Sequence, residues 1–198
     1  NDALRVGATV RQADSRLQTH PVLGEVLPHI GHFVTRNRGT VGGSIAHADA
    51  AAELPVALVA VGGAVVAAST RGRREITAEE LFLGPFTTAL APDELLVETT
   101  WPHLGEGEGF AFEELAQRGG DFALCMAAAR VHGHGLRVVV GAVTDRPTVL
   151  EVDPDRPGES AAEQVEPWGS THATPAYLKQ LVRVLVDRAV ARARAVAA

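Results

Sequence analysis

The chain has 198 residues, enough for one ordinary domain or two small ones with a buried core. Apolar residues make up 46% and charged residues 21%, a composition that excludes a disordered protein. No apolar run approaches the roughly 18 residues of a membrane span, and the first ten residues lack the pattern of a secretory signal. The single cysteine, Cys125, excludes a disulfide framework and any zinc or iron–sulfur site built from thiolates of this chain. We therefore expect a cytoplasmic protein.

Charge is distributed unevenly along the chain. The formal net charge is −6, yet residues 174–198 contain five basic side chains and one acidic side chain. Basic residues near the C-terminal end of a helix are favoured by the helix dipole. An acidic chain with one short basic segment does not suggest nucleic-acid binding, so we expect no nucleic-acid partner.

The first half of the sequence predicts short elements of mixed type. Alternation over residues 3–10 predicts a strand, for which the neighbouring sequence offers no evident partner. Residues 21–31 are weakly helical or irregular, and 54–63 predict a short buried helix that Glu53 caps and two glycines end. The remaining predictions are a hairpin over 64–70 and 74–78, a short helix capped by Thr77 and Glu80 and running through Leu83, a loop over 84–90, and a strand over 93–102.

The second half predicts strands followed by a long helix. The glycine-rich segment 105–109 is the best candidate for a subdomain boundary. Three strands are expected at 110–117, 122–132 and 136–143, although the Ala-rich middle segment could be helical by propensity. Residues 151–172 read as a loop or weak helix, and Thr174 with Pro175 starts a long amphipathic helix. The pattern is α+β, in two parts that join near residue 105.

The segment Thr40-Val41-Gly42-Gly43-Ser44 is the strongest candidate for a binding site. A glycine pair lets the backbone adopt positive φ and approach a ligand closely. Successive free amides in such a bend, with the hydroxyls of Thr40 and Ser44, suit an anion. A tight turn that needs glycine explains the same residues equally well. The spacing matches neither a Walker loop nor a dinucleotide fingerprint.

Other chemically active side chains give weaker signals. His47, Asp49 and Glu53 could hold a metal or act as acid and base, but such residues more often cap a helix, and no second His or Cys completes a ligand set. Two histidine pairs are expected at the surface: His29 with His32, and His132 with His134. The sequence contains no nucleophile elbow. We assign no catalytic residue and no metal ligand, so a cofactor would have to supply any chemistry.

Five segments in order resemble one family: "LRVGATV", "RNRGTVGGSIAHADAAAELPVAL", "LFLGPFTTALAPDELLVETTWP", "GFAFEELAQRGGDFALCMAAARV" and "TPAYLKQLVRVLVDRAV". They resemble the flavoprotein (medium) subunit of the molybdenum hydroxylases, the carbon monoxide dehydrogenase and xanthine dehydrogenase family. The likeness covers essentially residues 3–190. It implies an FAD-binding type-2-like α+β subdomain over 1–105. It also implies a flavoprotein C-terminal domain over 106–198, a small antiparallel sheet with helices.

The resemblance also implies a function and partners. Flavoproteins of this family bind FAD without a covalent bond and pass electrons to an acceptor from iron–sulfur clusters on a small subunit. A separate large subunit holds the molybdenum cofactor and hydroxylates the substrate. The expected partners are therefore these two subunits, and the free subunit could also self-associate.

The resemblance places the cofactor at particular residues. The segment Thr40 to Ser44 matches one of the family's two glycine loops for FAD. A family Asp near the cofactor falls on Glu53, and a family Leu near the flavin ring falls on Leu96. A Lys that some xanthine-oxidising relatives use near the flavin falls on Glu113, so that role does not transfer.

The family's other glycine loop has no match in this sequence. In the family it lies in about sixty further residues, a unit on the scale of a small subdomain, ahead of the matching part. No "AGG" or "GGQS" loop occurs here. Two hypotheses stay open: an electron-transfer flavoprotein subunit, or a truncated flavin-free relative that serves as a binding or scaffold module or catalyses another reaction in the old cofactor cleft.

Overall fold

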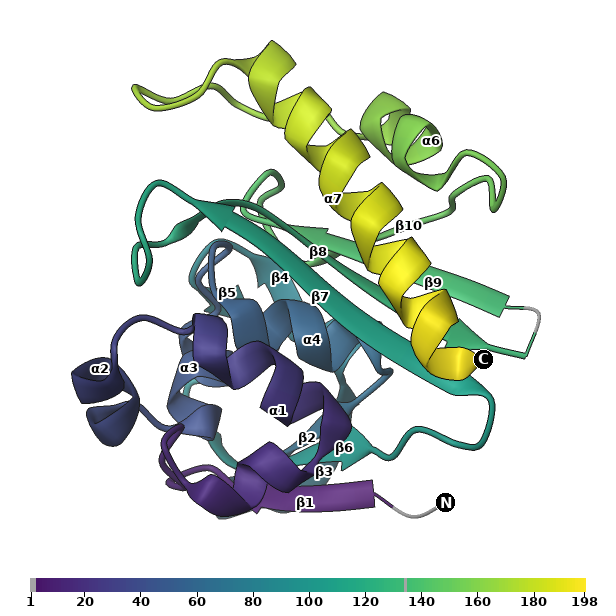
Figure 1. The fold of residues 1–198 in the computed structure, drawn as a ribbon. Helices are drawn as coiled ribbons and strands as arrows, with labels where there is room; N and C mark the ends of the chain where they lie inside the picture. Colours follow the sequence, from purple (N-terminus) through teal and green to yellow (C-terminus); the bar gives the residue numbers. More distant parts are fainter. Residues whose placement is uncertain (1–2, 134) are drawn as a thin grey trace.

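The computed structural model describes residues 3–133 and 135–198, so His134, one of the predicted surface histidines, lies outside the described residues. Within them, two four-stranded antiparallel sheets form the framework, in the orders β1-β6-β2-β3 and β10-β9-β8-β7. Helices α1, α3 and α4 lie between the two sheets, and α7 covers the outer face of the second one (Figure 1). The class is α+β, as predicted.

The first sheet contains β1 (Ala3–Gly7), β2 (Ala64–Ser69), β3 (Gly72–Thr77) and β6 (Leu95–Pro102). The predicted hairpin is β2 and β3, paired in register from Ala64 with Thr77. The expectation that the first strand lacks a partner was wrong. It pairs antiparallel with β6, Val6 opposite Thr99, a contact between distant parts of the chain.

Short helices fill the first half. They are η1 (Ser15–Thr19), α1 (Pro21–Val26), η2 (Leu27–His29), α2 (Phe33–Arg38), α3 (Val41–His47), α4 (Glu53–Ala60) and α5 (Ala78–Leu81). The glycine segment, predicted as a loop, forms the first turn of α3, and α2 was not predicted. The predicted loop over 84–90 contains part of a small ribbon, β4 (Phe82–Gly84) with β5 (Thr87–Thr88).

The second sheet contains β7 (Glu108–Ala116), β8 (Ala123–His132), β9 (Gly135–Gly141) and β10 (Thr148–Leu150). The Ala-rich segment is strand β8 rather than a helix because it is buried on both faces. Cys125 packs toward α7, whereas Met126 packs toward the helices between the sheets. Small side chains allow this close approach on both sides.

Two further helices belong to this half, α6 (Pro157–Gln164) and α7 (Pro175–Ala197). As predicted, the Thr174 hydroxyl caps α7 by accepting from the Tyr177 amide, at 3.2 Å. The predicted apolar stripe of α7, from Leu178 to Ala189, is buried against the second sheet. Among the described residues, no helix is both long enough and apolar enough to cross a membrane.

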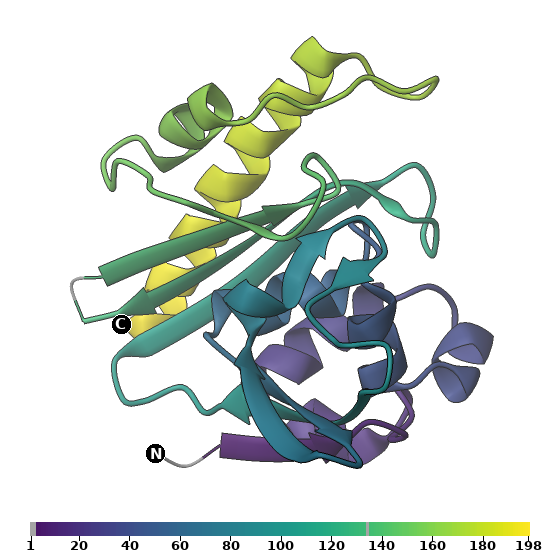
Figure 2. The same ribbon diagram turned by 180° about the vertical axis from the view of Figure 1, so that it is seen from behind.

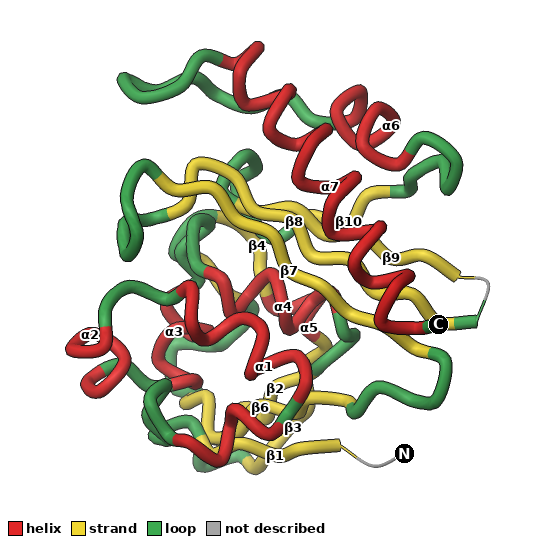
Figure 3. Tube along the Cα trace, in the orientation of Figure 1, coloured by secondary structure: helices red, strands yellow, loops and turns green. Residues whose placement is uncertain are grey.

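The centre of the molecule is α4. Every residue of this helix is buried, because it packs against β8 and β9 of the second sheet and against α1 and α3, and its side chains share one core cluster with the first sheet. Its N-cap is Ala52, so the predicted cap, Glu53, is instead the first helical residue. The view from behind shows the connection from β6 to β7, by which the chain crosses from the first sheet to the second (Figure 2). The trace coloured by secondary structure shows the helical layer between the two sheets (Figure 3). The domain division at residue 105 stays a prediction.

Candidate cofactor site

The predicted glycine loop is a capped helix start. The Thr40 hydroxyl accepts a hydrogen bond from the Gly43 amide at 2.9 Å, which makes Thr40 the N-cap of α3. This is the usual role of Thr at the beginning of a helix. Neither Gly42 nor Gly43 has a positive φ. The predicted left-handed bend is therefore wrong. The two glycines matter instead because they lack a side chain, which leaves room for neighbouring atoms.

The backbone amides of this segment are already bonded within the chain. Val41 donates to the Val10 carbonyl at 2.9 Å, and Gly42 donates to the Ala8 carbonyl at 3.1 Å. Ser44 donates to the Thr40 carbonyl at 3.1 Å. With Gly43 bonded to the cap, all four amides have partners. The predicted concavity of free amides for an anion is thus not formed.

The two glycines face different surroundings. Gly42 is buried, and a Cβ on it would come within 2.5 Å of the Ala8 Cα. Gly43 is exposed, and a Cβ there would meet only the Thr40 hydroxyl, at 2.6 Å. Gly42 is therefore needed for packing. Gly43 leaves bare backbone at the surface, which lets a flat or extended ligand approach closely.

The turn between α3 and α4 is fixed from two sides. The amide of Phe86 donates to the Ala48 carbonyl at 2.9 Å, and the amide of Ala142, after β9, donates to the Ala50 carbonyl at 2.8 Å. The Asp49 carboxylate accepts from the Ala51 amide at 2.9 Å, so it stabilises the turn. These contacts hold the start of α4 against the second sheet.

Glu53 lies at that start. Its exposed fraction is only 6%, and burial raises its pKa, with a further increase from the charge of Asp49. Helices α3 and α4 pack on each other, so the structure brings the Thr40–Ser44 segment and Glu53 to neighbouring helices. Leu96 is partly buried on β6, the strand against which α3 packs.

Sequence reasoning missed Glu114. It follows Phe110 and Phe112 at a spacing of two along β7, and all three side chains turn toward the helices between the sheets. The Glu114 side chain is 6% exposed, and burial together with the charge of Glu53 raises its pKa to about 8. The alternation along β7 was visible in the sequence and could have identified it.

His29 also differs from expectation. Its Nδ1 lies 3.8 Å from the Glu114 carboxylate, and its ring packs edge-on against Phe112, with 5.1 Å between the ring centroids. It is half-buried, and burial lowers its pKa. The prediction of a surface histidine is therefore wrong for His29, whereas His32 is exposed as expected.

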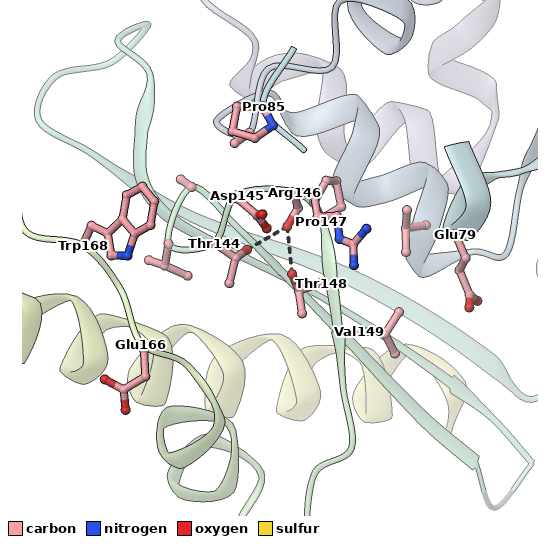
Figure 4. Close-up of a pocket in the computed structure, with 14 residues that line it drawn as sticks. Glu79, Pro85, Thr144, Asp145, Arg146, Pro147, Thr148, Val149, Glu166 and Trp168 are labelled. Atoms are coloured by element: carbon pink, nitrogen blue, oxygen red, sulfur yellow. Dashed lines mark hydrogen bonds between the residues drawn. The ribbon is translucent and has the colours of Figure 1, made fainter. Parts of the chain in front are cut away.

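A separate pocket lies on the second sheet. It has a volume of about 700 Å³ and is lined by the segment after β9, with Pro85, Glu79, Glu166 and Trp168 around it (Figure 4). None of the seven predicted cofactor residues lines it. In the described part of the chain, no group of three or more His, Cys, Asp or Glu side chains is placed to hold a metal ion.

Residues 1–104 match the family model described as "FAD binding domain in molybdopterin dehydrogenase". The 6-hydroxypseudooxynicotine dehydrogenase complex subunit alpha of Paenarthrobacter nicotinovorans is 34% identical over 98% of this chain and 73% of the relative. The carbon monoxide dehydrogenase medium chain of Hydrogenophaga pseudoflava is 32% identical over 86% of this chain and 56% of its own length.

Solved structures agree with these sequence matches. Quinoline 2-oxidoreductase from Pseudomonas putida 86 superposes with a TM-score of 0.90 at 32% identity, covering all of this chain and 76% of that one. Carbon monoxide dehydrogenase from Hydrogenophaga pseudoflava superposes with a TM-score of 0.92 at 26% identity, covering all of this chain and 77% of that one. The chain belongs to the FAD-binding medium subunits of the molybdenum hydroxylase family.

Proposed function

We propose that this chain is the electron-transfer flavoprotein of a molybdenum hydroxylase-type complex in the cytoplasm. It would relay electrons to an acceptor from iron–sulfur clusters on a small partner subunit, while a large partner subunit holds the molybdenum cofactor. The observation that carries this proposal is the family match over residues 1–104, because that segment contains both Thr40–Ser44 and Glu53.

The residues present fit FAD through surface shape and side chains. Gly43 leaves bare backbone exposed, and the Thr40 and Ser44 hydroxyls flank it. Val41 and Gly42 would fix the start of α3 beneath this surface. Glu53 would accept a hydrogen bond from a hydroxyl or N–H group, and Leu96 would offer apolar contact. The bound flavin would supply the capacity to accept and release electrons, and these residues would hold and orient it.

One observation favours the second candidate, a flavin-free binding or scaffold module. The four amides at positions 41–44 are used within the chain, so hydrogen-bond donors for a diphosphate must come from other residues. The two candidates therefore differ in a measurable property, the affinity for FAD.

The absorption spectrum of the purified protein and a titration with FAD distinguish them. The flavoprotein proposal expects a visible flavin band at close to one FAD per chain, either as purified or after FAD is added. A colourless protein whose fluorescence and absorption do not respond to added FAD would contradict it and support the flavin-free module.

A substitution tests the assigned surface. Gly43→Val places a branched side chain where the backbone is now bare, so FAD affinity should fall at least about tenfold, the cost of roughly 1.4 kcal/mol of lost contact. Gly105→Val is the matched control, because a Cβ there makes only ordinary contacts with Glu108. Circular dichroism should show both variants folded. Unchanged FAD affinity in Gly43→Val would refute this part of the site.

A further inference from the structure

The pocket on the second sheet is separate from the assigned FAD residues and has the size of a small-molecule site. Its volume of about 700 Å³ lies within the usual range for ligand pockets in proteins. Its walls include the turn before α4, the segment from Ala142 to Val149, and the loop that carries Trp168 (Figure 4). These walls come from distant parts of the chain, so the cavity exists only in the folded protein.

One wall of the pocket is held by unusual backbone. In the part of the chain that the structure describes, the non-glycine residues with positive φ are Ala48, Phe86 and Ala142, at 52°, 54° and 65°. All three meet at the turn between α3 and α4, where the Phe86 amide donates to the Ala48 carbonyl and the Ala142 amide to the Ala50 carbonyl. Such conformations cost energy and cluster at ligand sites. Ala50 and Ala142 line the pocket, so this wall is fixed before a ligand binds.

The free polar groups at the centre of the pocket are hydrogen-bond acceptors. The hydroxyls of Thr144 and Thr148 both donate to the Arg146 carbonyl, at 2.7 and 2.9 Å, so each oxygen is left to accept a further bond. The Asp145 carboxylate is exposed and forms no hydrogen bond or ion pair with another described residue. The Arg146 guanidinium donates instead to the Phe82 carbonyl, at 3.2 Å.

The other two carboxylates of the pocket have partners outside it. Glu79 forms an ion pair with Arg137, and Glu166 forms one with Lys179 at 2.7 Å. The charges without an ion-pair partner among the described lining residues are therefore those of Asp145 and Arg146. Figure 4 shows Asp145 on the Trp168 side of the pocket and the guanidinium of Arg146 on the Glu79 side. The Trp168 side thus offers a free negative charge.

Trp168 adds an aromatic face to that side. Its side chain is 88% exposed, although a tryptophan is usually largely covered in a folded protein. The face of an indole is the best aromatic partner for a cation, and a carboxylate forms short, strong hydrogen bonds with a charged N–H group. Trp168 and Asp145 line the same pocket, so one ligand can use both contacts.

We propose that this pocket binds a planar aromatic cation that carries N–H groups, with its ring against Trp168 and its charge at Asp145. The oxygens of Thr144 and Thr148 accept from further N–H groups of the ligand, and the prolines and valines of the walls contact its ring. This site goes beyond the proposed function, because it uses none of the residues assigned to FAD and binds its ligand with or without FAD.

Three small molecules of nearly the same shape test the proposal: benzamidine, which is a cation at neutral pH, neutral benzamide, and anionic benzoate. Calorimetric titration of the 198-residue chain at low salt should give benzamidine an affinity at least about tenfold above that of benzamide, with benzoate weakest. Added salt should reduce this preference. Absence of benzamidine binding, equal affinities for the three molecules, or a preference for benzoate at Arg146 would each overturn the proposal.

Variants show where the cation binds. Asp145→Asn should bring the affinities for benzamidine and benzamide within about twofold of each other, because it removes the charge and keeps the shape. Glu163→Gln is the matched control, since it removes one negative charge at an exposed position outside the pocket. It should keep the preference. If Asp145→Asn kept the preference as well, the assigned role of Asp145 would be wrong.

Fluorescence gives an independent location. The chain has two tryptophans, and Trp101 is fully buried, so a change in emission on adding benzamidine reports Trp168. Trp168→Leu should lose this change and should bind benzamidine at least about threefold more weakly. An emission change that persists in Trp168→Leu would place the ligand elsewhere. All these measurements are made without FAD, so a protein that binds benzamidine but no FAD would overturn the proposed function alone.

Discussion

Gly42 at the start of α3 lies directly on Ala8, the residue that follows β1. The Gly42 amide donates to the Ala8 carbonyl at 3.1 Å, and a Cβ on Gly42 would lie 2.5 Å from the Ala8 Cα and 2.9 Å from its carbonyl oxygen. The Ala8 amide in turn donates to Val97 of β6 at 2.9 Å. The helix that begins at the predicted FAD segment is therefore joined through Ala8 to the first sheet.

Gly42→Ala should destabilise the protein although it adds a better helix former. The collision involves backbone atoms of Ala8, which cannot move without disturbing the bond to β6. We expect the free energy of unfolding to fall by about 1–3 kcal/mol, the usual cost of overpacking a core, as measured by urea denaturation. Gly105→Ala, at an exposed position with room for a methyl group, should change stability far less. Equal stability of the two variants would show that Gly42 is not needed for packing.

The same contact shows what sequence reasoning could recover. Sequence reasoning assigned Gly42 and Gly43 to a candidate FAD segment, but it described them as a bend with free amides. The Gly43 amide bonds to the neighbouring Thr40 hydroxyl, whereas the amides of Gly42 and Val41 bond to the carbonyls of Ala8 and Val10. These two carbonyls lie about thirty residues earlier, a separation at which sequence pattern gives no pairing signal. For the same reason the partner of β1 was not foreseen, since β6 comes from the far end of the first half.

Predictions were most accurate where local patterns decide the structure. The hairpin β2–β3, the cap of α7 at Thr174 and its apolar stripe depend on neighbouring residues, and all were confirmed. Helix α2 was missed because none of its residues is buried, so it shows no apolar periodicity. The family resemblance points to Glu113, whereas alternation along β7 places its neighbour Glu114 on the same face as Phe110 and Phe112.

Cys125 should be unreactive in the folded protein. Its side chain is fully buried on β8, and burial raises the pKa of the thiol to about 12, so almost no thiolate exists at neutral pH. We expect a disulfide reagent to label the native protein very slowly and the denatured protein at once. Cys125→Ala should lower the free energy of unfolding by about 1 kcal/mol, as for other small core truncations. Rapid labelling under native conditions would mean that β8 is accessible.

Mild acid should destabilise the protein through His20. This residue is 2% exposed at the start of α1, and its ring centroid lies 4.9 Å from that of His103. Burial lowers its pKa, and the charge of His103 lowers it further. The unfolded chain therefore takes up this proton more readily than the folded one, so the stability due to a neutral His20 is lost as the pH falls below about 6.5.

His20→Phe isolates this contribution, because it keeps a ring against His103 but cannot be protonated. Urea denaturation of both proteins between about pH 5 and about pH 8 covers the relevant range. The variant should gain stability relative to the unmodified protein as the pH falls through this range. The comparison with the variant is needed because Glu114 has the opposite effect. Its pKa is raised to about 8, so its protonation adds stability to the folded protein as the pH falls below that value. A difference independent of pH would contradict the role of His20.

Arg192 connects the long helix α7 to both halves of the molecule. Its guanidinium donates to the Phe112 carbonyl at 3.0 Å and to the Glu113 carboxylate at 2.8 Å, and it forms an ion pair with Glu25 of α1 at 2.5 Å. Glu25 belongs to the helical layer between the sheets, whereas Glu113 and Phe112 belong to β7. Arg192→Met retains the aliphatic stem but removes all three contacts.

Because the Arg192 side chain is half-exposed, the expected loss is modest, about 1 kcal/mol in the free energy of unfolding at low salt. The deficit should shrink as the salt concentration rises, since salt screens the two carboxylate contacts in the unmodified protein. Arg192→Lys should recover only part of the loss, because an ammonium group cannot reproduce the forked geometry. Arg188→Met, at an exposed position of the same helix, is the matched control. If the two Met variants were equally stable at every salt concentration, Arg192 would not contribute to joining the two halves.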